Sequence, residues 1–120
     1  MTTTATILGP TIYGIPSGNY DGSSDQDWAS DAAQAANYYL GRGSMQTITV
    51  DVTGFVGVIT LEATLDADSD SATWFDTYTI TATSALTNRQ VNTVTGNFTW
   101  MRVHVREFDA GTINFVTITY

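Results

Sequence analysis

The stretch of sequence that decides the fold class is residues 46–65, which read QTITVDVTGFVGVITLEATL. Apolar and polar residues alternate through residues 46–53, pause at Gly54–Gly57, and alternate again through residues 58–65. Such alternation is typical of β-strands with one buried face. The two strands, joined by a short glycine-containing turn, predict an antiparallel hairpin.

The same alternation extends over the remainder of the chain. Residues 74–82, 98–108 and 112–120 each predict a strand, and residues 91–95 predict a short, weakly paired one. Turns are expected at Gly96-Asn97 and at Asp109-Ala110-Gly111. The apolar phase of these strands predicts a shared core made of Ile48, Val50, Val52, Ile59, Leu61, Leu65, Trp74, Ile80, Met101, Val103 and Val105.

The first 45 residues are less regular. Short strands are expected at residues 4–8 and 11–15, followed by a polar loop over residues 16–24. One short helix is also expected, since apolar residues then recur at helical spacing, at Trp28, Ala32, Ala35, Ala36 and Tyr39. A loop that wraps the core would show the same residues.

Many short strands with little helix predict an all-β chain that folds as an antiparallel β-sandwich of jelly-roll type. Residues 1–120 form one domain in this prediction, with an irregular wrapping segment at 1–45 and the core strands at 46–120. An immunoglobulin-like sandwich is the second choice, because the Cys and Trp spacing of that class is absent.

Composition excludes several classes of function. The 120 residues carry 12 acidic and 4 basic side chains, a formal net charge of -8. A chain this acidic lacks the basic surface that nucleic acid requires. Without cysteine it has neither disulfides nor thiolate metal sites. No apolar run is long enough to cross a membrane as a helix, so neither nucleic acid nor membrane is an expected partner.

Neither a metal site nor a catalytic site is predicted. Asp66, Asp68 and Asp70 alternate as at the start of a calcium-binding loop, but Ser71 and Thr77 stand where an EF-hand requires Gly and Glu. The single histidine lies on a regular strand, and no G-x-S-x-G nucleophile motif is present. The sequence therefore predicts a protein that is not an enzyme and has no cofactor.

One strand carries an unusual outward phase, made of Trp100, Arg102, His104 and Arg106. Trp and Arg are enriched at the centres of binding interfaces. We expect this stripe to be covered by another subunit or by the N-terminal segment. The alternative is a mixed solvent-facing surface whose Arg stems lie over the sheet.

Aromatic residues gather in the irregular N-terminal third. They have two interpretations: exposed rings that stack on sugars, or rings that cap the open end of the sandwich or contact another subunit. Capping or subunit contact is favoured. The residues concerned are Tyr13, Tyr20, Trp28, Tyr38 and Tyr39.

Roughly residues 45–120 resemble small virion proteins of tailed bacteriophages, particularly those of marine cyanobacterial phages. The resemblance is carried by the order of Val52–Asp66, Trp74-Phe75, Gly96–Val103 and Gly111–Tyr120. These segments are similar to phage sandwich domains of the galactose-binding-like jelly-roll type. Such domains often belong to longer adhesins, whereas this sequence holds the domain alone.

The resemblance implies a non-enzymatic structural subunit of a phage particle, of the decoration or accessory kind. Its implied location is the virion. Its implied partners are capsid or tail proteins of a head or tail lattice, on which it would form a homo-oligomer. The alternative function, from the aromatic residues, is a carbohydrate-binding module that recognises a host-surface glycan.

Overall fold

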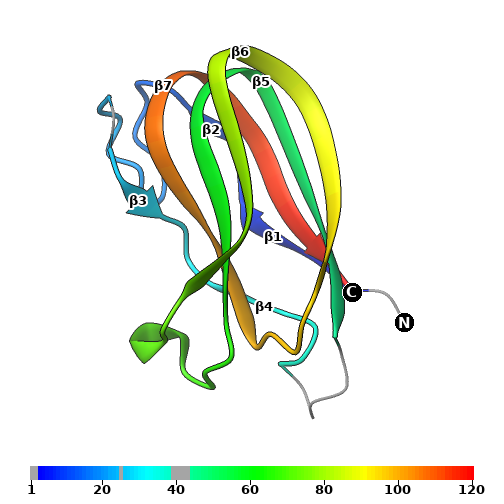
Figure 1. Ribbon diagram of the computed structural model, residues 1–120. Coiled ribbons are helices and arrows are strands. Elements are labelled where there is room, and N and C mark those ends of the chain that lie inside the picture. The colour runs from blue at the N-terminus through cyan, green and yellow to red at the C-terminus, as the bar shows by residue number, and fades with distance from the viewer. Residues whose placement is uncertain (1–2, 25, 39–43) are drawn as a thin grey trace.

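The protein is an all-β chain in the computed structural model, which describes residues 3–24, 26–38 and 44–120 (Figure 1). Its strands are β1 (Thr4–Leu8), β2 (Thr11–Ile12), β3 (Trp28–Ala29), β4 (Ala33–Gln34), β5 (Met45–Thr64), β6 (Phe75–Thr95) and β7 (Trp100–Thr119). One 3-10 turn, η1 (Ser69–Ser71), links β5 to β6, and the described residues contain no α-helix.

Three long strands build the sandwich. β5, β6 and β7 contain 20, 21 and 20 residues, and each arches over the same end of the molecule so that its two halves lie in facing layers (Figure 1). All pairings between these strands are antiparallel. The predicted antiparallel β-sandwich is therefore confirmed, and a single bent sheet supplies both of its layers.

β7 lies inside the sheet, whose order is β1-β7-β5-β6. β5 pairs with one of its edges, while the short strands β1 to β4 pair in turn along the other. The N-terminal segment thus runs beside β7 from one end of that strand to the other. Among the strands that the structure describes, β6 pairs with β5 alone and forms an edge of the sheet.

The predicted hairpin at residues 46–65 is wrong. Both halves belong to β5, and they pair with β6 and β7 instead of with each other. Gly54 and Gly57 have φ of 59° and 153°, and the register with both neighbours shifts here. At these glycines the strand bends but does not reverse its direction. The alternation of residues in the sequence is the same on both sides of a bend as on both sides of a turn, so it does not distinguish the two.

The turn predicted at Asp109–Gly111 is wrong for the same reason, whereas the strand predicted at 91–95 is present as part of a longer strand. Residues 109–111 lie within β7, which bends between Glu107 and Gly111 with φ of 54° and 86° at these two residues. Residues 91–95 are the end of the long strand β6. In both places a bend within a long strand interrupts the sequence pattern without ending the strand.

The predicted short helix is also wrong. Trp28 pairs with Val105 in β3, and Ala33 pairs with Met101 in β4. Trp28 and Ala35 are buried because the extended segment packs on the sandwich. Tyr39, the last residue of the helical pattern, lies outside the described residues. The wrapping loop, kept as the alternative, agrees with the structure.

The core fills the space between the two layers and contains most of the predicted residues. Leu65 and Trp74 are the exceptions: Leu65 is 63% exposed and Trp74 is partly exposed. Both lie in the connection between β5 and β6, beyond the paired ends of the strands. The core also includes Phe55 and Phe108, which come from the bends and are fully buried.

Candidate functional site

A row of polar residues crosses the outer face of one layer. There β5 and β7 pair Thr64 with Trp100, Glu62 with Arg102, Thr60 with His104 and Val58 with Arg106. We call these eight residues the charged face. Thr60, Glu62 and Thr64 are buried despite facing outward. Glu62, the charged residue among these three, is only 8% exposed.

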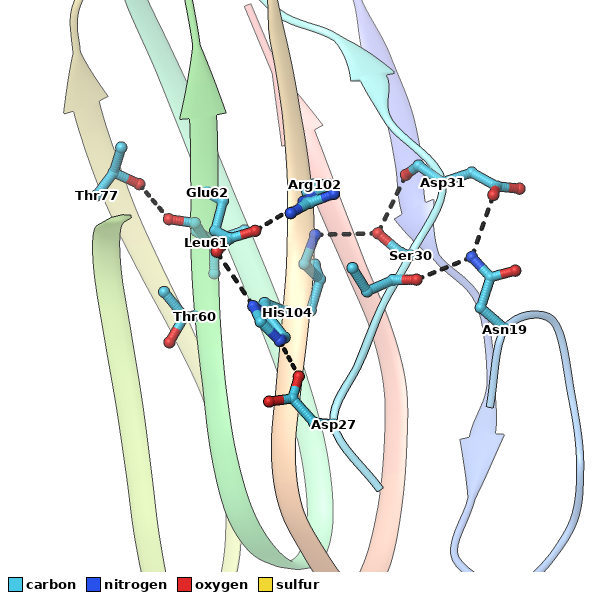
Figure 2. Close-up of polar contacts among 12 residues, drawn as sticks. Asn19, Asp27, Ser30, Asp31, Thr60, Leu61, Glu62, Thr77, Arg102 and His104 are labelled. Atoms are coloured by element: carbon cyan, nitrogen blue, oxygen red, sulfur yellow. Dashed lines mark hydrogen bonds and ion pairs between the residues drawn. The ribbon is translucent and has the colours of Figure 1, made fainter. Parts of the chain in front are cut away.

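Glu62 is the centre of this face (Figure 2). Its Oε1 accepts a hydrogen bond from Arg102 Nε at 2.7 Å, and its Oε2 lies 3.1 Å from His104 Nδ1. The other ring nitrogen of His104 contacts Asp27 Oδ1. A carboxylate partner on each side requires both nitrogens to carry hydrogen, as in the charged imidazolium.

The surroundings of His104 change its pKa in two opposing ways. Partial burial by itself lowers the pKa, since it disfavours the charged ring. Hydrogen bonds to Asp27 and Glu62, with the attraction of their charges, outweigh burial and raise the pKa above its ordinary value of 6.5. The charged form of His104 thus bridges Asp27 of the N-terminal segment and Glu62 of the sheet.

The other members of the predicted stripe also contact their own chain. Trp100 donates its indole hydrogen to the Ala67 carbonyl at 3.1 Å and meets Tyr38 edge to face. Arg106 donates to Thr60 Oγ1 at 3.1 Å. Asp27 and Tyr38 belong to the N-terminal segment, which is one of the two coverings expected for this stripe. Contact with another subunit stays a prediction.

A cleft of about 410 Å³ opens beside Arg102. Four parts of the chain line it: the link between β3 and β4, the 3-10 turn η1, the residue before β6, and Arg102 of β7. Its walls carry methyl, hydroxyl, carboxylate, guanidinium and indole groups, from Ser30, Asp31, Ala32, Ser69, Asp70, Trp74 and Arg102.

The wall formed by residues 30–32 is held in place by hydrogen bonds. Ser30 N donates to the Val103 carbonyl at 2.8 Å, and Val103 N donates to Ser30 Oγ at 3.0 Å. Asn19 Nδ2 donates to Asp31 Oδ1 at 3.2 Å and to the Ala29 carbonyl at 2.8 Å (Figure 2). These bonds fix Asp31 at the edge of the cleft.

The opposite wall is held by the aspartate-rich loop. Asp68 Oδ1 accepts from Asp70 N at 2.9 Å and begins η1, while Asp66 Oδ2 accepts from Thr73 N at 2.7 Å. The Arg102 guanidinium carbon lies 4.5 Å from the centre of the Trp74 ring, a cation-π contact. Asp66 and Asp68 therefore shape the loop that presents Asp70 and Trp74.

A second cleft, of about 460 Å³, is lined by Asp27, Val58, Arg106 and Glu107. It lies at the end of the charged face nearest the bend of β7. Glu107 has a φ of 54°, which few residues other than glycine adopt. The backbone at the border of this cleft is thus held in an uncommon conformation.

The aromatic residues predicted for glycan or subunit contact mostly support the fold. Tyr20 and Trp28 are 1% and 5% exposed and pack on each other. Tyr13 and Tyr20 also pack on Phe108. Tyr38 lies against Trp100, and Tyr39 is outside the described residues. The buried rings of Tyr20 and Trp28 are not available to stack on a sugar.

Sequence reasoning missed the residues that line the cleft at Arg102. It assigned Trp74 to the core, considered Asp70 only as part of an incomplete calcium-loop pattern, and gave Asp31 no role. The available signal was the position of Trp74, directly after a loop with three alternating aspartates. Nothing in the sequence alone brings Ser30 and Asp31 to that loop.

No group of three or more His, Cys, Asp or Glu side chains in the described part of the chain is placed to hold a metal ion. No helix among the residues that the structure describes is long and apolar enough to span a membrane.

No protein-family model matches the sequence, and no curated protein matches it. Solved structures give matches across nearly the whole chain. One is a family 29 carbohydrate-binding module from Piromyces equi, with 15% identity, coverage of 98% of this chain and 90% of that one, and a TM-score of 0.43. Another is chitosan-binding module 1 of a chitosanase/glucanase from Paenibacillus sp. IK-5, with 19% identity, coverage of 100% and 93%, and a TM-score of 0.41. Both TM-scores are low, so neither similarity identifies a ligand for this chain.

Proposed function

We propose that this protein binds carbohydrate in the cleft at Arg102. The observation that carries the proposal is the set of groups lining that cleft: two carboxylates, two hydroxyls, a guanidinium and an indole around about 410 Å³ of space. This volume falls within the range of about 300 to 1,000 Å³ that is usual for ligand sites. The predicted carbohydrate-binding module thus becomes the main functional interpretation.

The chemistry of the lining suits a sugar ring. Sugar hydroxyls donate to carboxylates, which are supplied here by Asp31 and Asp70, and they accept from guanidinium groups such as that of Arg102. The indole of Trp74 adds a flat apolar surface beside these polar groups. A hydroxyl-rich ligand therefore finds both kinds of partner within one cleft.

The cleft is formed before the ligand arrives. Glu62 Oε1 accepts a hydrogen bond from Arg102 Nε, and the Trp74 ring packs against the same guanidinium. Ser30 and Asp31 are held by their bonds to Val103 and Asn19. Side chains that are already ordered lose little conformational entropy on binding, which favours affinity.

Affinity gel electrophoresis against a panel of soluble polysaccharides, followed by calorimetry with the best ligand, tests this function. Trp74→Ala and Asp70→Asn are expected to abolish the retardation seen with the unchanged protein. Val91→Ala is the matched control, since Val91 is 63% exposed on the opposite layer. No retardation by any polysaccharide, or equal retardation of all variants, would contradict the proposal.

The virion location and the capsid or tail partners stay predictions from the sequence resemblance. They concern where the protein is found, whereas the cleft concerns what it binds. Purification of phage particles from an infected host, followed by mass spectrometry, would test them. Loss of the protein during purification would contradict a structural role on the particle.

A further inference from the structure

β6 presents a long open edge. It is the last strand of the sheet, pairs with β5 on one side, and has no described strand on the other. Its 21 residues follow the arch through both layers (Figure 1). Most of them are exposed. An edge of this kind has backbone donors and acceptors free to pair with another strand.

The sequence of this edge lacks the usual protection. Natural edges are commonly blocked by charged side chains or proline. From Thr77 to Asn88 the strand contains no charged residue and no proline. It is instead rich in threonine, which favours extended backbone. The central residues Thr83, Ser84 and Ala85 are small, so another strand can approach closely.

We propose that this edge binds the β6 edge of a second copy of the chain, in antiparallel register about a two-fold axis at Thr83. In that register Thr79 faces Thr87 and Ile80 faces Leu86 of the other copy. Ile80 is buried and Leu86 packs on the core. Core-facing residues therefore meet core-facing residues, as a continuous sheet requires.

The charges at the two ends of this pairing are complementary. β6 departs from regular register with β5 at the arch, where Leu86 lies opposite Phe55 and Ala82 opposite Gly57, so that residues 83–85 at the proposed axis have no partner in β5. A second irregularity lies at Thr77, where the register passes from Tyr78 opposite Leu61 to Asp76 opposite Glu62. The same irregularity moves the pairing with the second copy by one residue. Asp76 then stands opposite Arg89, on the outer side of the sheet.

Both side chains are accessible for this contact. Asp76 is exposed, and the Arg89 side chain is 63% exposed although its Nε donates to Asp51 at 2.7 Å. Opposite charges directly across two strands stabilise the pair, and like charges destabilise it. The two-fold axis creates this contact twice. This self-complementarity is the reason for choosing a second copy over an unrelated extended peptide.

The arch is compatible with such a pair. A two-fold axis perpendicular to the sheet at Thr83 leaves both arches bending in the same direction. The ascending half of one β6 then lies beside the descending half of the other. Two sandwiches would stand side by side, joined by one continuous sheet.

Sedimentation equilibrium over a wide concentration range tests the proposal. The unchanged protein is expected to dimerise reversibly. Thr83→Lys places two like charges opposite each other at the axis, and Asp76→Lys faces Arg89, so both variants are expected to lose the dimer. Thr6→Lys, on the exposed part of β1, is the matched control and should keep it. Circular dichroism and melting temperature show whether each variant is folded.

A second variant gives a positive signal. The chain has no cysteine, so Thr83→Cys introduces a single thiol at the proposed axis. Under mild oxidation it is expected to form a disulfide-linked dimer, while Thr6→Cys stays monomeric. A monomeric protein at every concentration together with no excess cross-linking of Thr83→Cys would overturn the proposal. A dimer that survives both lysine substitutions would overturn it as well.

Discussion

Glu62 shows how one buried carboxylate organises a surface. It faces outward by strand alternation, yet Arg102 and His104 cover it and occupy its two oxygens. A buried carboxylate without such partners would be costly. The sequence predicted the outward phase of Arg102 and His104 correctly, but not their contacts with Glu62, because the pairing of β5 with β7 and its register are not contained in either strand alone.

His104 makes stability depend on pH. Its pKa is raised in the folded state, so the folded protein binds this proton more strongly than the unfolded chain does. The resulting stabilisation is fully present below the unfolded pKa, about 6.5, and is lost as pH rises through the folded pKa. We expect the denaturant midpoint to fall over this range of pH, and His104→Gln to reduce that fall.

The chain has one histidine, so this comparison has a clear assignment. Denaturant unfolding from about pH 6 to pH 9 covers the expected window. Equal changes in the midpoint for His104→Gln and the unchanged protein would show that the contacts to Asp27 and Glu62 do not stabilise the charged ring.

Leu61 and Leu65 separate the real core from the predicted one. Both lie on the same phase of the sequence pattern, but Leu61 is fully buried and Leu65 is 63% exposed. We expect Leu61→Ala to lower the free energy of unfolding by about 2 to 5 kcal/mol. Leu65→Ala should change it by about 0.5 kcal/mol or less. Comparable losses in the two variants, measured by urea unfolding, would contradict the position given to residue 65.

At the scale of elements, the arches of β5 and β7 are the feature that sequence patterns could not predict. The alternation located the strand halves and their buried faces, as at Ile48 and Ile59. A glycine between two alternating runs, however, is compatible with either a turn or a bend. The choice between them depends on the partner strands, which come from distant parts of the chain.

Gly111 tests the geometry of these arches. Its φ is 86°, and a Cβ added there would lie 2.3 Å from the carbonyl carbon of Gly54 on β5. Gly111→Ala is therefore expected to destabilise the fold by about 1 to 3 kcal/mol from backbone conformation, with the close contact adding to it. Gly9→Ala is the control, because a Cβ there meets nothing within 4 Å.

Thermal unfolding of the two variants measures this difference. A melting temperature of Gly111→Ala equal to that of Gly9→Ala would show that β5 and β7 do not approach each other at Gly54 and Gly111. The arches would then need a different geometry.

At the scale of the whole molecule, the candidate site depends on parts of the chain that the sequence separates widely. The N-terminal segment brings Asp31, the loop after β5 brings Asp70 and Trp74, and β7 brings Arg102. Charge and composition bear only on the classes of partner that the sequence leads us to expect. They gave no information on a site assembled from three such segments.

The most direct test of carbohydrate binding at this site is an NMR titration in which an oligosaccharide is added to the protein. The signals of the three tryptophan indole groups are followed during the titration. Trp74 lines the cleft, Trp28 is buried in the core, and Trp100 donates its indole hydrogen to Ala67. We predict a saturable shift of the Trp74 indole signal, with shifts of the backbone amides of residues 30–32 and 69–71. An unchanged Trp74 signal, with shifts confined to residues on the opposite layer, would contradict the proposed site.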